Sequence, residues 1–190
     1  MTNWPLYPRI HQAVTALHSG GVIAYPTEAV WGLGCDPENI KAIEHLLHLK
    51  QRLPQKGLIL VASHIRQFNF LLHDLSKEHY QQLEHSWPGP YTWLVPHKGR
   101  VSPWITGQFD TVALRVSNHR VIQSLCNHYK GPIVSTSANP QGKPPAVFAW
   151  QVHRYFGAET LDAITNGHTG ASSKPSEIRD LLSGRIIRPA

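Results

Sequence analysis

Apolar residues recur along this chain with two spacings, one typical of helices and one typical of buried strands. Near the N-terminus, Ile10, Val14 and Leu17 share one helical face, which predicts a helix that stops at Gly20 and Gly21. The next residues are continuously apolar over 22–25, which predicts a buried strand. Helical patterns and short apolar runs continue to alternate up to the C-terminus.

A second helix is expected from Asp36, as an N-cap with Pro37 at the first helical position, to about Lys50. Later helices are expected over 64–73, 76–85, 117–129 and 147–156. Later strands are expected over 58–61, 91–95, 112–116, 132–134, 162–165 and 185–188. Strands that alternate with helices and return as short pieces predict an α/β fold with one open, mixed sheet flanked by helices.

The 190 residues contain no repeat, no low-complexity tract and no long linker, so we expect a single domain over 1–190. Cys35 and Cys126 lack Cys-x-x-Cys spacing, so neither a zinc knuckle nor a disulfide framework is expected. No apolar run reaches the roughly 20 residues of a membrane helix. The first residues lack the pattern of a signal peptide, so a cytoplasmic location and no membrane partner are expected.

The net charge of the chain is +6, and its distribution narrows the choice of partner. Between residues 45 and 154 there are twelve Lys and Arg against four Asp and Glu. This middle region therefore carries +8, and the two ends together carry −2. Such segregation indicates an anionic partner, either phosphate-bearing small molecules or nucleic acid.

Several standard catalytic signatures are absent, among them G-x-x-x-x-G-K-[ST], H-E-x-x-H and G-x-S-x-G. Gly32 and Gly34 supply two of the three glycines of a dinucleotide fingerprint, and Pro37 stands where the third would be, which excludes a Rossmann site. His45 and His48 could share a helix face, but nothing indicates a third ligand. No metal site is therefore expected.

Polar residues gather just past the predicted strands, where open α/β sheets bind ligands. Thr27 and Glu28 follow the first strand, although an exposed turn is the alternative. Lys50, Arg52 and Lys56 form a basic window without an acid. Such a window suits a polyphosphate, although a solvated loop is the alternative.

Arg115 lies inside the otherwise apolar stretch 112–116, where an unpaired guanidinium would be costly. It therefore needs either a structural acid such as Asp110 or a ligand carboxylate. In the stretch Ser-Thr-Ser-Ala-Asn, residues 135, 137 and 139 would project to one side of an extended segment. This favours a row of groups that orients a ligand, with a Ser/Thr turn as the alternative.

Together these segments resemble the YrdC-like family over about 8–189, with the length of its short bacterial form. The segments that carry the resemblance are PTEAVWGLG at 26–34, LKQR at 49–52, KGLIL at 56–60, WPGP at 87–90, ALRV at 113–116, STSAN at 135–139, PSEIR at 175–179 and IRP at 187–189. One departure is visible. The family usually has Pro directly after Arg52, where this chain has Leu53, which puts the shape of that loop in question.

The resemblance implies threonylcarbamoyl-AMP synthase activity, in which L-threonine, bicarbonate and ATP give L-threonylcarbamoyladenylate, pyrophosphate and water. The adenylate would feed a downstream transferase complex that makes N6-threonylcarbamoyladenosine in tRNA. The implied fold is an open, twisted mixed sheet with helices around a concave, positively charged cavity. ATP is then a substrate, and Mg²⁺ is expected to accompany it, bound mostly by its phosphates, with Glu28 as the nearest candidate acid.

The resemblance also implies a role for individual residues. Catalytic roles fall on Lys50, Arg52, Ser137 and Asn139. ATP-binding roles fall on Lys50, Arg52, Thr111, Ser137, Pro145 and Arg188. Threonine-binding roles fall on Thr27, Lys56, Arg115 and Ser135, with Arg115 on the threonine carboxylate.

An RNA-binding module that uses the same basic middle region is the alternative function, and contact with tRNA is compatible with both. Aromatic stacking platforms would favour the RNA-binding module. Here Trp87, Trp93 and Trp104 are interleaved with Pro rather than arrayed along one strand face. The pattern therefore favours the enzyme.

Overall fold

The computed structural model describes residues 8–157, 159–172 and 174–190, and in these residues nine strands form one sheet. Their spatial order is β7-β1-β2-β6-β3-β5-β4-β8-β9. The strands are β1 (Ile23–Pro26), β2 (Trp31–Gly34), β3 (Ile59–Ala62), β4 (Tyr91–Pro96), β5 (Thr111–Val116), β6 (Ile133–Ser137), β7 (Ala163–Ile164), β8 (Glu177–Asp180) and β9 (Ile186–Arg188). Three neighbouring pairs are parallel and the others antiparallel, which confirms the predicted mixed sheet.

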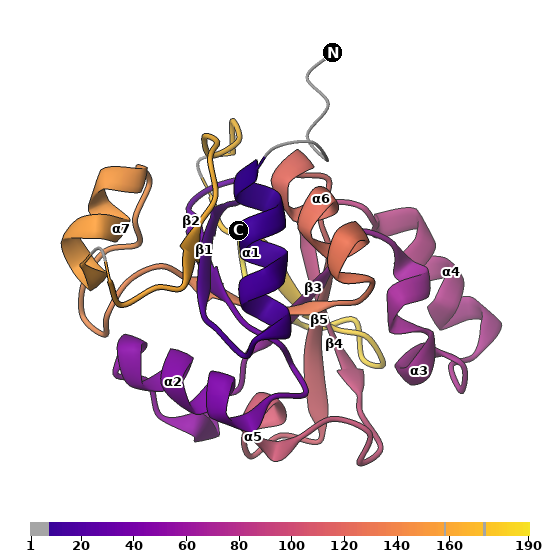
Figure 1. The fold of residues 1–190 in the computed structure, drawn as a ribbon. Coiled ribbons are helices and arrows are strands. Elements are labelled where there is room, and N and C mark those ends of the chain that lie inside the picture. Colours follow the sequence, from indigo (N-terminus) through magenta and orange to yellow (C-terminus); the bar gives the residue numbers. More distant parts are fainter. Residues whose placement is uncertain (1–7, 158, 173) are drawn as a thin grey trace.

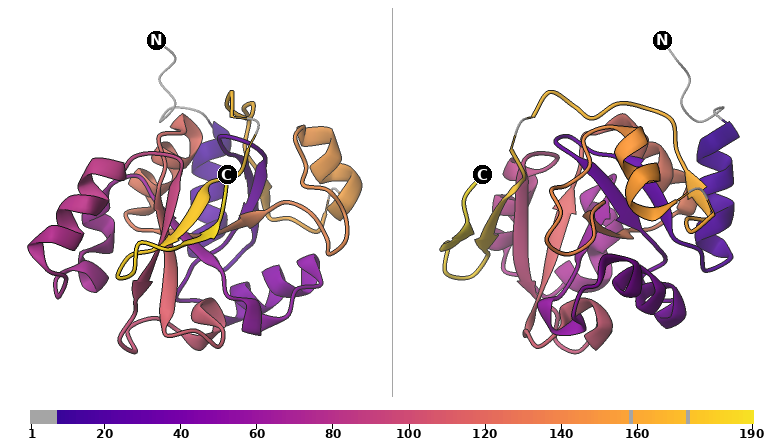
Figure 2. Two further views of the ribbon diagram at one scale, coloured as in Figure 1. Left: turned by 180° about the vertical axis from the view of Figure 1, so that it is seen from behind. Right: turned by 90° about the vertical axis from the view of Figure 1, so that its left-hand side faces the viewer.

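Helices flank this sheet, as predicted (Figure 1). They are α1 (Pro8–His18), α2 (Ile40–Lys50), α3 (Asn69–Leu72), α4 (Lys77–Ser86), α5 (Pro103–Thr106), α6 (Arg120–Tyr129) and α7 (Ala149–Phe156), with 3₁₀ turns η2 (Pro54–Lys56) and η3 (Ile65–Phe68). Helices α1 and α6 lie side by side over one face of the sheet. Seen from behind in Figure 2, the hairpin β8–β9 crosses the opposite side.

Two outcomes concern membranes and the N-terminus. In the part of the chain that the structure describes, no helix has the length and apolar character needed to cross a membrane. The expectation that the chain begins without a signal peptide rests on residues 1–7, which lie outside the described residues.

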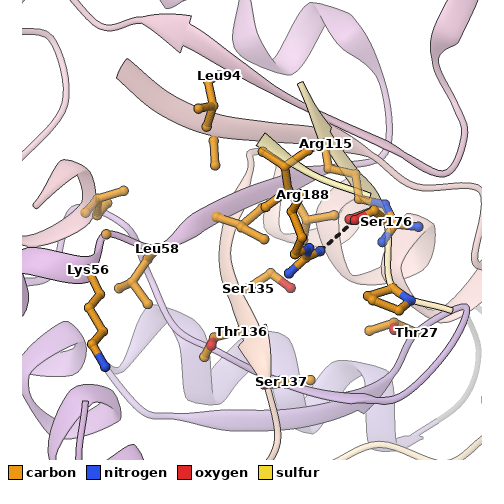
Figure 3. A pocket seen from close by; sticks show the side chains of 18 of the residues that line it. Thr27, Lys56, Leu58, Leu94, Arg115, Ser135, Thr136, Ser137, Ser176 and Arg188 are labelled. Carbon is orange, nitrogen blue, oxygen red and sulfur yellow. Dashed lines mark hydrogen bonds between the residues drawn. The ribbon is translucent and has the colours of Figure 1, made fainter. Parts of the chain in front are cut away.

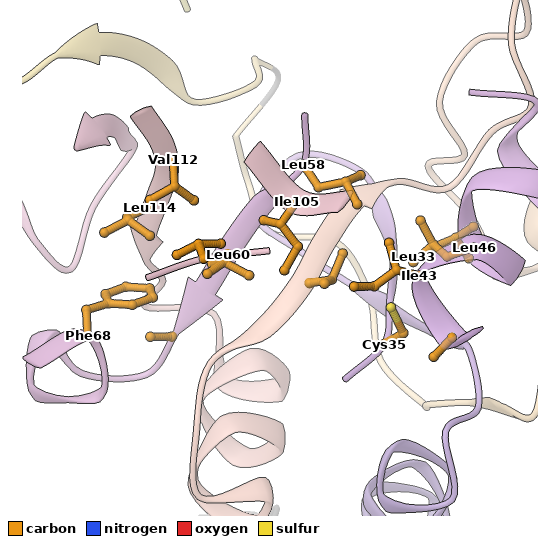
Figure 4. Packing of buried hydrophobic residues seen from close by; sticks show 14 of the residues in the cluster. Leu33, Cys35, Ile43, Leu46, Leu58, Leu60, Phe68, Ile105, Val112 and Leu114 are labelled. Atoms are coloured by element: carbon orange, nitrogen blue, oxygen red, sulfur yellow. The ribbon is translucent and has the colours of Figure 1, made fainter. Parts of the chain in front are cut away.

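The hydrophobic core has two parts on opposite sides of the central strands. Under α1 and α6, Leu17 and Ile122 pack with Val61 of β3. On the other side, Leu60 and Leu114 pack with Phe68, in a cluster that continues through α2 (Figure 4). Burial of these apolar side chains is the main favourable term that holds the helices to the sheet.

Strand β5 has one face in the core and one face turned away from it. Its residues 112, 114 and 116 are buried, whereas residues 111, 113 and 115 are only partly buried. This alternation follows from strand geometry, because successive side chains point to opposite faces. Arg115 therefore does not lie among the apolar residues that precede and follow it, which resolves the apparent cost of its position.

Two helices begin later than the sequence predicts, because local hydrogen bonds compete with the helix. Asp36 is not the N-cap of α2; its Oδ1 accepts from the backbone N of Glu38 at 2.8 Å, and Asn39 caps the helix instead. Helix α6 begins at Arg120 rather than near residue 117. The hydroxyl of Ser117 accepts a hydrogen bond from the backbone N of His119 in a local turn before the helix.

Two strands fall where the pattern predicts none, and both are at positions set by distant pairing. Strand β8 pairs with β4. Strand β2 contains Gly32 and Gly34, which have low strand propensity, yet it is fully buried between β1 and β6. A Cβ on Gly34 would come 2.5 Å from the carbonyl oxygen of Val134 and 2.9 Å from the Tyr25 ring. Close packing of strands, rather than turn formation, therefore requires this glycine.

We predict that Gly34→Ala destabilises the fold by about 1–3 kcal/mol, because the added methyl overlaps backbone that cannot move without breaking the sheet. Denaturant unfolding measures the change. Gly131→Ala is the matched control, since its Cβ would meet only the Tyr129 ring, at 3.6 Å. Equal stability of the two variants would contradict the packing argument.

Candidate active site

A cavity of about 400 Å³ lies against the face of the sheet to which the Arg115 side chain points (Figure 3). One row of paired residues runs across four strands and lines it, namely Leu94, Ala113, Ile59 and Ser135. Strands β2 and β9 also contribute to the lining, although they are third and ninth in the strand order. The sheet must therefore curve around the cavity.

Positive charge converges on this cavity. Four cationic side chains line it, namely Arg52, Lys56, Arg115 and Arg188, and no Asp or Glu is found among the described residues of the lining. Hydroxyl groups of Thr27, Thr111, Ser135 and Ser137 lie among them. Such a lining suits a ligand that carries phosphate or carboxylate groups.

Arg52 is held by the loop that follows it. Its Nη2 donates to the carbonyl oxygens of Lys56, at 3.3 Å, and Gly57, at 2.8 Å, while its buried Nε has no partner. Burial lowers the pKa of Arg52, but an arginine stays charged in this range. The side chain of Leu53 is 61% exposed, and its φ of −68° is the angle that Pro would impose. The departure at Leu53 therefore leaves the backbone of the loop in a shape that Pro could also adopt.

Lys50 does not line the cavity. Its side chain is buried behind the end of β6, where Nζ donates to the carbonyl oxygens of Ser137 and of Asn139, the latter at 2.9 Å. Burial, together with the nearby charge of Arg52, lowers the pKa of Lys50 to about 8. This lysine joins the C-terminal end of α2 to the segment that carries Ser137.

Asn139 and Pro145 also lie outside the cavity lining. The backbone turns after Ser137, and the Asn139 Nδ2 donates to the carbonyl oxygens of Pro140 and Lys143, at 3.2 and 2.7 Å. The expected row of residues 135, 137 and 139 therefore ends at Ser137. Pro145 is exposed on the segment that follows.

Arg115 pairs with Glu28, not with Asp110. Its Nη2 lies 2.9 Å from Glu28 Oε1, and the Ser117 hydroxyl donates to the same oxygen at 2.7 Å. Asp110 precedes Arg115 by five residues, which in an extended strand corresponds to about 16 Å. An acid at the start of β5 is thus too far away, whereas the turn after β1 brings Glu28 close.

Arg188 enters the cavity from the last strand. Its Nη2 donates to the carbonyl oxygen of Ser176 at 2.6 Å, and the two residues meet in Figure 3. Burial and the nearby charge of Arg115 lower the pKa of Arg188. Ser176 is one of the lining residues that the sequence does not identify, because its place depends on the pairing of β8 with β4. Ala113 is also a lining residue, and the alternation of side chains in β5 could have identified it, since it points to the same face as Arg115.

Comparisons with known proteins agree along the whole chain. The family model Sua5_yciO_yrdC, described as telomere recombination, matches residues 15–190. The threonylcarbamoyl-AMP synthase of Saccharophagus degradans is 59% identical over 188 residues, which are 99% of this chain and 98% of that protein. The threonylcarbamoyl-AMP synthase of Cellvibrio japonicus is 51% identical over the full length of both chains.

A solved structure of P. abyssi Sua5 complexed with L-threonine superposes with a TM-score of 0.87 at 30% identity. The match covers 95% of this chain and 53% of the Sua5 chain, so this chain spans about half the length of that protein. The fold is thus shared over nearly all of this chain. This chain belongs to the Sua5–YciO–YrdC family.

Proposed function

We propose that this chain is a threonylcarbamoyl-AMP synthase and that the cavity lined by Arg52, Lys56, Arg115 and Arg188 is its active site. The observation that carries the proposal is the convergence of these four cations, from separate segments, on a cavity with no acid among its described lining residues. Full-length relatives at 51–59% identity carry this name, and the related Sua5 binds L-threonine.

The reaction joins three substrates. The amine of L-threonine attacks bicarbonate, and loss of water leaves a carbamate. A carbamate oxygen then attacks the α-phosphorus of ATP; a P–O bond forms, and the bond to the β-phosphate breaks to release pyrophosphate. The adenylate carries the threonylcarbamoyl group to the enzymes that modify tRNA.

Threonine binds at the Arg115 end of the cavity. Its carboxylate meets the Arg115 guanidinium in a charge-assisted contact, and the side chains of Thr27 and Ser135 lie on the same part of the lining. The phosphates of ATP lie toward Arg52 and Lys56, and Thr111 and Arg188 also contact the nucleotide. Ser137, which also lines the cavity, orients the carbamate.

Catalysis consists of positioning and charge neutralisation, without a covalent enzyme intermediate. Negative charge that builds on the phosphates is offset by side chains already held in place by the protein, so little reorganisation is needed. Lys50 and Asn139 contribute by fixing the segment that carries Ser137 through their bonds to backbone carbonyls.

Mg²⁺ would accompany ATP, bound mostly by its phosphates, and would neutralise part of its charge. The described residues include no group of three or more His, Cys, Asp or Glu side chains placed to hold a metal. Glu28 Oε1 is already engaged by Arg115 and Ser117, its buried Oε2 has no hydrogen-bond partner, and Glu28 is not among the described residues of the cavity lining.

Two observations weigh against an RNA-binding module as the main function. Trp87 and Trp93 are buried in the core and offer no stacking platform. Lys98 and Arg100, two bases of the basic middle region, form ion pairs with Asp74.

We predict that Arg52→Ala lowers the rate of adenylate formation by about 10²–10³, because a charge held at the transferring phosphates is lost. The product is measured by mass spectrometry after incubation with ATP, threonine and bicarbonate. Arg66→Ala removes an exposed arginine elsewhere in the basic middle region and keeps wild-type activity. Full activity of Arg52→Ala would place the phosphates elsewhere.

We predict that ATP binding weakens as the pH rises through about 8, the pKa of Lys50. A neutral amine still has two N–H groups for its two carbonyl partners, so the segment stays in place while one positive charge is lost. The affinity should fall by about two- to tenfold between pH 7 and 9, measured by calorimetry.

Lys50→Met is the control, because it has no charge to lose and its ATP affinity should not vary in this way. An equal pH dependence in both proteins would rule out Lys50 as the cause.

The lowered pKa of Lys50 also affects the stability of the fold. Between pH 8 and the ordinary lysine pKa of 10.5 the unfolded state binds more protons, so the folded state gains stability as the pH rises.

A further inference from the structure

Glu28 lies next to the proposed threonine site, where its side chain pairs with Arg115. Arg115 lines the cavity, whereas Glu28 is absent from the described lining. The two side chains are 15% and 16% exposed, and the contact between Arg115 Nη2 and Glu28 Oε1 measures 2.9 Å. A pair so far removed from water is screened much less than a surface ion pair.

Ser117 completes this arrangement. Its hydroxyl donates to Glu28 Oε1 at 2.7 Å and accepts from the backbone N of His119 at 3.0 Å. One carboxylate oxygen is therefore held between a guanidinium and a hydroxyl, both of which come from β5 or the residue that follows it.

The backbone of Glu28 is anchored as well. Its carbonyl oxygen accepts from the backbone N of Ser172 at 3.2 Å, and that of Thr27 accepts from Gly170 at 2.9 Å. A Cβ on Gly170 would come 2.9 Å from the backbone carbonyl oxygen of Glu28, so the two segments are in close contact. The hydroxyl of Thr27 donates to the carbonyl oxygen of Val30 at 2.7 Å and fixes the turn.

The guanidinium keeps donors for a ligand. Glu28 pairs with Nη2, and the buried Nε has no partner; Nη1 makes no hydrogen bond among the described residues, so Nη1 is the donor that a ligand can reach. An arginine has five N–H donors in a planar fork, and a carboxylate is best bound by two of them at once. Bidentate binding is strongest when the protein already holds the plane of the guanidinium in the right orientation, because less ordering is then needed when the ligand binds.

We infer that Glu28, supported by Ser117, is a positioning residue for threonine that holds the Arg115 guanidinium so that its remaining N–H groups face the amino-acid carboxylate. This inference rests on the proposed function, because it assigns the carboxylate of threonine to Arg115. Glu28 does not touch substrate; it acts through Arg115 alone. The opposite arrangement, in which Glu28 occupies Arg115 as a competitor that threonine must displace, predicts the opposite change in affinity.

The test is steady-state kinetics of Glu28→Ala, Glu28→Gln and Ser117→Ala, with threonine and ATP varied separately. Glu28→Ala should raise the KM for threonine by about 10- to 100-fold, because it removes the charge that pairs with Arg115 and accepts from Ser117, and leave the KM for ATP near wild type. Glu28→Gln retains an oxygen that accepts from Ser117 but loses the charge that pairs with Arg115, so it should recover only part of the threonine affinity. Ser117→Ala should fall between the two.

Asp74→Asn is the matched control, since it breaks an ion pair with Lys98 and Arg100 outside the cavity and should change neither KM. Thermal unfolding of every variant identifies loss of folding, and Glu28→Gln and Ser117→Ala decide the question if Glu28→Ala does not fold. A KM for threonine that is unchanged or lower in Glu28→Ala overturns the inference, as does an equal rise for threonine and ATP. Absence of adenylate with the wild-type chain would instead refute the proposed function.

Discussion

The alternation of side chains along the central strands is the constraint on which the cavity depends. In β5, one set of residues fills the core and the other set, Thr111, Ala113 and Arg115, faces the cavity. Strand β3 divides in the same way, with Leu60 in the core and Ile59 on the cavity side. Because the period is two, a register shift of one residue would exchange the two faces and move Arg115 into the core.

Positive charge is kept in this cavity because two of its four cations, Arg52 and Arg188, pair with backbone carbonyls rather than with acids. Arg52 donates to the carbonyls of residues 56 and 57, Arg188 to that of Ser176, and Lys50, behind the lining, to those of Ser137 and Asn139. A carbonyl carries only a partial charge, so these groups are held without being neutralised. Arg115 alone among them faces a carboxylate, which matches a role in binding one carboxylate rather than a triphosphate.

Much of the candidate site could be predicted from the sequence, because short motifs preserve local chemistry. Thr27, Arg52, Lys56, Thr111, Arg115, Ser135, Ser137 and Arg188 all reach one cavity. The prediction could not distinguish a side chain that lines the cavity from one that supports it. Lys50 and Asn139 belong to the same motifs but turn toward backbone carbonyls, since those acceptors come from a segment almost ninety residues away or from a local turn.

The sequence by itself determined the alternation of helices and strands, the basic middle region and the family, because these depend on local periodicity and ordered motifs. Only the tertiary structure decided the partner of Arg115, the burial of Lys50 and the place of Ser176. Each of these depends on contacts between segments far apart in the chain, such as Glu28 with Ser117 or β8 with β4. Strand pairing and sheet curvature set those contacts, and no local pattern encodes either one.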